Sequence, residues 1–119
     1  MSTIHSFRKE GVKYAWEGVI PKAYETKPGV VRHILIGENE GSENFIIRYF
    51  SIEPGCVSNL ERHPHEHGVV ILHGKGRVQL NEEFFEIGAM DAIYITGDDL
   101  HQFTNVGDEP FGFICVIKA

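Results

Sequence analysis

The stretch Glu61-Arg62-His63-Pro64-His65-Glu66-His67 carries a histidine or a glutamate at every second position, beginning with Glu61. In an extended backbone every second side chain lies on the same face, so residues 61, 63, 65 and 67 can converge on one point. A further histidine, His101, follows later in the chain. Imidazole nitrogens and a carboxylate oxygen without a cysteine partner suit a divalent zinc, manganese, iron, nickel or copper ion. The sequence therefore predicts one divalent transition-metal ion per chain.

Short segments rich in β-branched and aromatic residues surround this stretch, and turns containing Gly, Pro or Asn separate them. The expected strands are residues 30–36, 44–52, 68–72, 76–80, 84–87, 92–95 and 111–117. Seven or more short strands at intervals of roughly 8–12 residues are typical of an all-β sandwich or barrel. Residues 1–29 contain several helix breakers and predict an irregular arm with one short strand, in front of a barrel formed by residues 30–119.

Composition excludes several classes of protein. At 119 residues the chain is one domain. A net charge of −6 argues against nucleic acid as a partner, because phosphate binding depends on Lys and Arg. No apolar run reaches the roughly 18 residues needed to span a bilayer, so we expect no membrane partner. The N-terminus has no secretory pattern, and Cys56 and Cys115 are too few for a disulfide framework. We expect a cytoplasmic protein with reduced thiols and a small-molecule ligand.

Together, the strands and the histidine cluster resemble the cupin superfamily, whose fold is a double-stranded β-helix, or jelly-roll barrel. The first cupin motif is Gly, five residues, His-x-His, three or four residues, Glu, six residues, Gly. Its positions fall on Gly55, Glu61, His63, His67 and Gly74. The spacings fit, but Glu61 stands where the family has its first His, and His67 stands where it has Glu. Both replacements are competent metal ligands, so the resemblance implies a three-His, one-carboxylate site.

The second cupin motif, which is Gly, five residues, Pro-x-Gly, two residues, His, three residues, Asn, matches less well. Its positions fall on Met90, Thr96, Asp98, His101 and Asn105. Only the His and the Asn are retained. The resemblance therefore implies that His101 is the third histidine ligand, and we expect Asn105 to shape a turn.

The fourth ligand stays open between Glu61 and His65. The family has a tight turn between its second and third ligands, which would swing residue 65 away from the metal. If the chain stays extended there, His65 replaces Glu61 in a His-x-His pair. We expect His5, His33 and His73, which lie outside both motifs, to be surface residues.

We expect four residues to line a pocket beside the metal: Cys115, Arg48, Phe50 and Met90. Cys115 lies in the last expected strand and is either a small buried hydrophobe or a pocket thiol near the metal. Arg48 shares a strand face with Phe50, and it could hold an anionic ligand if that face points inward. Met90 and the aromatic side chains would form apolar walls.

The resemblance implies a metal-dependent small-molecule protein, such as a dioxygenase, isomerase or decarboxylase, but a fold does not choose among reactions. The alternative is a non-catalytic ligand-binding or sensing barrel with a structural metal or none. Cupins often pair through edge strands or N-terminal segments, so we expect a homodimer in which the N-terminal arm is the contact element.

Overall fold

The structure, a computed structural model, describes residues 2–119 and consists almost entirely of β-strands. The elements are β1 (Phe7–Glu10), β2 (Lys13–Trp16), β3 (Lys22–Ala23), β4 (Val30–Ile36), the 3-10 helix η1 (Glu38–Glu40), β5 (Phe45–Ile52), β6 (His67–His73), β7 (Lys75–Leu80), β8 (Glu83–Gly88), β9 (Ala92–Ile95), β10 (His101–Asn105) and β11 (Phe111–Lys118). Within the described residues, the single turn of η1 falls far short of the length and hydrophobicity of a membrane-spanning helix.

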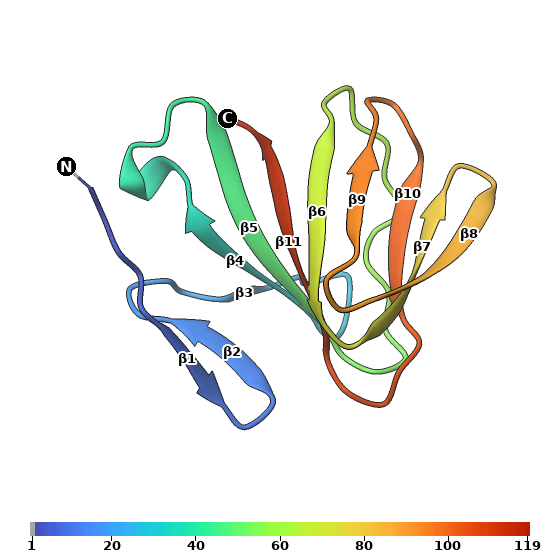
Figure 1. The fold of residues 1–119 in the computed structure, drawn as a ribbon, viewed down its shortest axis with the longest axis horizontal. Coiled ribbons are helices and arrows are strands. Elements are labelled where there is room, and N and C mark those ends of the chain that lie inside the picture. The colour runs from blue at the N-terminus through green and yellow to red at the C-terminus, as the bar shows by residue number, and fades with distance from the viewer. Residues whose placement is uncertain (1) are drawn as a thin grey trace.

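Two sheets form the two layers of an open barrel (Figure 1). The larger sheet has the order β3-β4-β5-β11-β6-β9, and the smaller has the order β10-β7-β8. The segment before β6 extends the smaller sheet, since Val57 bridges to Thr104 and Glu61 bridges to His101. The predicted jelly-roll barrel is therefore confirmed as the fold class, although its sheets are not closed into a continuous ring.

The cross-strand register decides which side chains point between the sheets. Arg48 on β5 lies opposite Cys115 on β11, which in turn lies opposite Val69 on β6. Phe50, two residues along, lies opposite Phe113. Residues directly opposite each other in antiparallel strands share a face, so this register places all five side chains on the inner face.

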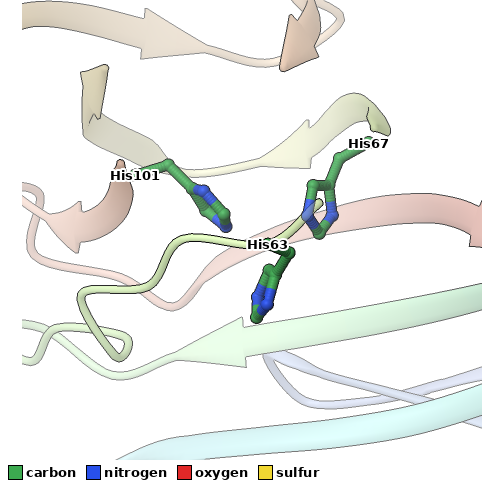
Figure 2. A group of neighbouring side chains, drawn as sticks. All are labelled: His63, His67 and His101. Atoms are coloured by element: carbon green, nitrogen blue, oxygen red, sulfur yellow. The ribbon is translucent and has the colours of Figure 1, made fainter. Parts of the chain in front are cut away.

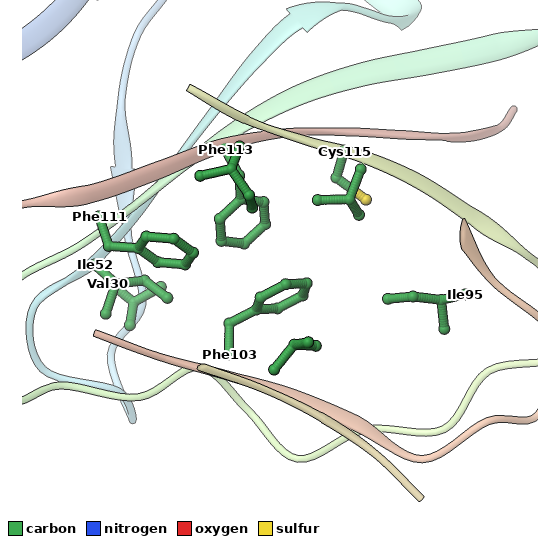
Figure 3. Close-up of a cluster of buried hydrophobic side chains, with 10 residues drawn as sticks. Val30, Ile52, Ile95, Phe103, Phe111, Phe113 and Cys115 are labelled. Carbon is green, nitrogen blue, oxygen red and sulfur yellow. The ribbon is translucent and has the colours of Figure 1, made fainter. Parts of the chain in front are cut away.

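Burial between the sheets is nearly complete for ten apolar residues, most of which are labelled in Figure 3. They are Val30, Ile52, Val69, Ile71, Val78, Ile95, Phe103, Phe111, Phe113 and Cys115. The rings of Phe103 and Phe113 stack with their centroids 4.4 Å apart. Removing this apolar area from water is the main source of stability for a domain of this size.

The N-terminal arm is more regular than the sequence predicts. Strands β1 and β2 pair as a hairpin, and β3 joins the edge of the larger sheet beside β4. Gly11 has φ 63, a left-handed conformation that glycine adopts at little steric cost, and it closes the two-residue turn between β1 and β2. In the sequence, Gly11 beside charged residues indicates only that a helix is interrupted. In the structure, the same glycine closes a hairpin.

The hairpin covers the outer face of the larger sheet with aromatic contacts. Trp16 lies 4.9 Å from the ring of Tyr49 and 5.7 Å from that of His33, and Tyr14 lies 4.3 Å from the ring of His73. His73 Nε2 also lies 2.6 Å from the Tyr49 hydroxyl. His33 is therefore only 6% exposed and His73 is half-buried.

The prediction of surface positions for the histidines outside the motifs is wrong. His33 and His73 are covered because the arm folds back onto the sheet. His5 is half-buried because its Nε2 pairs with the Glu40 carboxylate at 3.0 Å. Strand periodicity alone gives no sign of this cover.

Burial lowers the pKa of His33 and of His73, so the folded chain should lose stability as the pH falls through about 6.5. The unfolded chain binds protons in that range while the buried rings resist them, and proton uptake therefore favours unfolding. His33→Phe removes one such group and the buried Nδ1 that has no partner among residues 2–119. We expect a smaller loss of unfolding free energy between pH 7 and pH 5 than in the wild type, measured by urea denaturation.

A control of opposite sign is available at His5, whose pKa is raised by its hydrogen bond to Glu40. Protonated His5 stabilises the folded chain at low pH, so His5→Gln should make the loss of stability larger. If His33→Phe and the wild type lose the same free energy over this range, the buried histidine does not cause the pH dependence.

Candidate metal centre

Three imidazoles converge at one end of the space between the sheets (Figure 2). His67 is the first residue of β6, His101 is the first residue of β10, and His63 lies on the segment leading to β6. One nitrogen from each ring lies within 4.8 Å of the corresponding nitrogens of the other two. His67 and His101 are 5% and 8% exposed, and His63 is half-buried. The three histidines predicted as ligands are therefore brought together.

Hydrogen bonds orient two of these rings through their Nδ1 atoms. His101 Nδ1 lies 2.9 Å from the backbone carbonyl oxygen of Asp99, and His67 Nδ1 lies 3.4 Å from the sulfur of Cys115. In each ring Nε2 is the remaining nitrogen that could bind a metal. Proteins usually orient a metal-binding histidine by a hydrogen bond to the ring nitrogen that does not bind the metal.

The donor chemistry of His67 fits a metal ligand. Its Nε2 is buried and has no hydrogen-bond partner among the described residues, a costly arrangement unless the atom binds something. Burial, with smaller contributions from neighbouring cationic groups, lowers the pKa of His67 to about 4. The ring is therefore neutral at pH 7, with a lone pair available for a divalent cation.

Glu61 lies beside this group of three. Its backbone pairs with His101 in both directions, with N···O distances of 3.0 and 2.9 Å. Its carboxylate Oε2 lies 2.6 Å from Nε2 of His63. Glu61 is therefore held at the centre by the bridge to β10 and lies next to one of the three histidines.

His65 also faces the centre. The backbone bends at residues 64 and 65, as the family resemblance implies, but the bend does not swing His65 away. Its ring stacks on His63 with a centroid distance of 4.9 Å and an interplanar angle of 8°, and it lies 4.9 Å from the ring of His67. Both candidates for the fourth ligand thus border the group of three histidines.

A cavity of about 330 Å³ opens beside the histidines, with mostly apolar walls. Of the four residues expected to line a pocket, Cys115, Arg48 and Phe50 do so. The prediction for Met90 is wrong. Met90 is 76% exposed, lies in the turn between β8 and β9 with φ 74, and does not line the cavity. The left-handed backbone conformation of Met90 turns its side chain away from the cavity, and the motif alignment does not reveal this conformation.

Cys115 is both a buried residue and a pocket residue, the two alternatives left open by the sequence: it is 4% exposed, and it lines the cavity. Arg48 Nη2 donates a hydrogen bond to its sulfur at 3.2 Å. Burial raises the pKa of the Cys115 thiol, although Arg48 opposes that shift. The sulfur therefore connects Arg48 to His67 as a neutral group.

Asn105, expected to shape a turn, does so from a buried position. Its side-chain amide donates to the carbonyl oxygens of Ile52 and Glu109, and its Oδ1 accepts from the backbone N–H of Gly107. Several residues that were not predicted also line the cavity, among them Tyr24, Lys27 and Arg32. Alternation along residues 30–36 could have placed Arg32 on the inner face with Val30, but nothing local indicates Tyr24 or Lys27.

A family model for the cupin domain matches residues 48–117, which include most of β5, all of β6 to β10 and most of β11. This chain therefore belongs to the cupin family. The matched residues include all three histidines and Cys115.

Among curated proteins, a relative from Rhodospirillum rubrum named 1-methylthio-D-xylulose 5-phosphate methylsulfurylase is 36% identical over 118 residues. That alignment covers 95% of this chain and 74% of the relative. An uncharacterized protein of Methanocaldococcus jannaschii is 30% identical over 97 residues, covering 79% of this chain and 77% of the relative.

Solved structures show the same fold. A cupin-2 domain from Rhodospirillum rubrum superposes with a TM-score of 0.83 at 37% identity, covering 95% of this chain and 78% of that one. A cupin 2 conserved barrel domain protein from Rhodopseudomonas palustris gives 0.80 at 29% identity, covering 98% and 81%. A polyketide cyclase from Streptomyces resistomycificus shares the fold with a TM-score of 0.78 at 21% identity, covering 85% and 74%.

Proposed function

We propose that this chain is a metal-dependent enzyme that transforms a small organic molecule at the three-histidine centre. The observation that carries the proposal is the convergence of His63, His67 and His101, within 4.8 Å of one another, at a cavity of about 330 Å³. These three residues would hold one divalent transition-metal ion, with Glu61 or His65 as a fourth ligand. The ion would supply Lewis-acid chemistry by polarising a substrate oxygen.

The surrounding residues define what the chain itself contributes. Phe50, Phe103 and Phe113 line the cavity with apolar surface, which lowers the local dielectric constant and strengthens electrostatic interactions inside. If His65 is the fourth ligand, the Glu61 carboxylate beside His63 is free to act as a general base. The Rhodospirillum rubrum relative is named for a small sugar-derived substrate. We therefore place the substrate of this chain among small, oxygen-rich molecules, and the reaction among isomerisations, decarboxylations and oxidations.

The test is elemental analysis of protein purified without a histidine tag or a chelator. We expect about one iron, manganese, nickel, copper or zinc ion per chain, and a redox-active ion would justify screening for O₂ consumption with phenols and small keto acids. Metal below about 0.1 per chain that reconstitution does not restore would overturn the proposal.

A structural metal in a non-catalytic ligand-binding barrel is the second candidate. It is favoured by the presence of both Glu61 and His65 at the centre, because five protein ligands would leave little room for substrate. Azide added to the copper-loaded protein distinguishes the two. A change in the visible spectrum on saturable binding supports an open catalytic site, whereas an unchanged spectrum supports the closed one.

We also propose that the chain forms a homodimer through its N-terminal arm. Ile4 and Ile20 on the arm are 89% and 87% exposed, and a second copy could cover them. Light scattering should give twice the 13.4 kDa chain mass. A monomeric mass would contradict this proposal and leave the metal site unaffected.

A further inference from the structure

One wall of the cavity is cationic in a chain whose net charge is −6. Lys27, Arg32 and Arg48 all line it, and they come from the loop before β4, from β4 and from β5. The proposed metal centre does not use any of the three. Their presence in a cavity whose walls are mostly apolar needs a separate explanation.

The sheet register brings the two arginines toward each other. Ile34 lies opposite Arg48, and Arg32 lies opposite Phe50, so Arg32 and Arg48 are diagonal neighbours on adjacent strands. Diagonal neighbours lie about 7–8 Å apart, within the combined reach of long side chains. Two guanidinium groups on the same inner face can therefore contact one ligand.

Aromatic rings, not carboxylates, support these guanidinium groups. The Cζ atom of Arg32 lies 5.8 Å from the ring centroid of Tyr24, and that of Arg48 lies 5.0 Å from the ring centroid of Phe50. The rings of Tyr24 and Phe50 are themselves stacked, with centroids 6.4 Å apart. This support fixes the positions of the cations without neutralising their charge.

None of the three cations forms a salt bridge within residues 2–119. By contrast, the surface arginines Arg8 and Arg77 pair with Glu10 and Glu86. The one carboxylate that lines the cavity, Glu61, lies against His63 instead. In Arg48, Nε is buried and has no partner in the described part of the chain. All three cations are half-buried, and partial burial without an anion costs free energy, so an arrangement of this kind favours an anionic ligand.

We propose that Lys27, Arg32 and Arg48 form a subsite for the phosphate group of a phosphate monoester, and that this group anchors the substrate. Three cations around one ligand suit a dianion better than a single carboxylate, and arginine forms paired hydrogen bonds with phosphate oxygens. Because Cys115 contacts both Arg48 and His67, the subsite adjoins the histidines. The inference rests on the proposed function, since it takes the cavity as the substrate site.

The test measures binding of glycerol 3-phosphate by calorimetry at constant ionic strength, with glycerol and acetate as comparison ligands. The wild type should bind the phosphate ester saturably and at least about tenfold more tightly than acetate. Arg32→Gln should raise its Kd at least about tenfold, which is the effect of losing one charge-assisted contact. Lys27→Gln should act in the same direction, and the matched control Arg77→Gln should change the Kd less than twofold.

Metal content measured in the same samples separates this inference from the proposed function. If the protein lacks metal but Arg32→Gln still weakens phosphate binding, the subsite stands and the metal-dependent function fails. If metal is present and Arg32→Gln binds like Arg77→Gln, the subsite is overturned alone. Phosphate affinity that disappears on metal removal but not in Arg32→Gln would also overturn it, since the ion would then be the phosphate site.

Discussion

His67→Ala should abolish stoichiometric metal binding. His67 supplies a buried, neutral imidazole whose Nε2 has no partner within the described residues, and it is the most deeply buried of the three histidines. Removing a residue that only supports a ligand costs about 10–100-fold in metal affinity, so losing a ligand should cost at least about 100-fold. Metal content should fall from about one ion to below about 0.1 per chain, measured by elemental analysis after dialysis against metal-free buffer.

His5→Ala is the matched control, because His5 pairs with Glu40 and does not line the cavity. It should retain full metal content. Circular dichroism must show that His67→Ala remains folded before its metal content is interpreted. Unchanged stoichiometry in Glu61→Ala, His63→Ala, His67→Ala and His101→Ala would eliminate the metal centre.

The same assay decides between the two candidates for the fourth ligand. The Glu61 carboxylate lies 2.6 Å from His63, whereas His65 contacts the group by stacking on the His63 ring. A carboxylate carries a negative charge, which attracts a divalent cation more strongly than a neutral imidazole does. We therefore expect Glu61→Ala to weaken metal binding more than His65→Ala, and the reverse order would assign His65.

Strand periodicity predicted most of the fold because β4, β5, β6, β7, β10 and β11 each bury residues of one face between the sheets. The expected strands at residues 30–36 and 92–95 coincide with β4 and β9, and five others differ from the observed strands only at their ends. The expected strands do not include β10, although its buried positions alternate, because the motif assigns His101 to a ligand and the Asn105 side chain favours a turn. A short segment that carries functional residues can also be a regular strand.

The candidate site was predictable only where local spacing determines it. His63 and His67 lie in one segment, and His101 matches a motif, so their convergence follows from sequence and resemblance together. Lys27 lines the cavity because the β3–β4 edge lies beside β5, a long-range contact without a local pattern. The prediction for Met90 is wrong for a local reason: Met90 lies in a turn, and the turn directs its side chain away from the cavity.

Phe111→Ala should be among the most destabilising substitutions in this chain. Phe111 is fully buried, and its ring lies 5.5 Å from that of Phe113 and 6.5 Å from that of Phe103. A Cβ placed on Gly76 of β7 would overlap the Phe111 ring, so the ring fills a space that a glycine leaves open between the two sheets. Replacing such a ring leaves a cavity that the surrounding backbone cannot easily fill, at a cost of about 3–5 kcal/mol. Urea denaturation of the wild type and the variant measures the difference in unfolding free energy.

Phe84→Ala on β8 is the matched control, because it removes the same atoms from a side chain that is 62% exposed. It should change the unfolding free energy by less than about 1 kcal/mol, since most of the ring already contacts water. If Phe111→Ala also cost less than about 1 kcal/mol, the two sheets would not be held together by the aromatic core. A large loss of unfolding free energy in Phe111→Ala and a small one in Phe84→Ala would show that packing between the two sheets stabilises the barrel. The inner faces of the same two sheets also position the histidines.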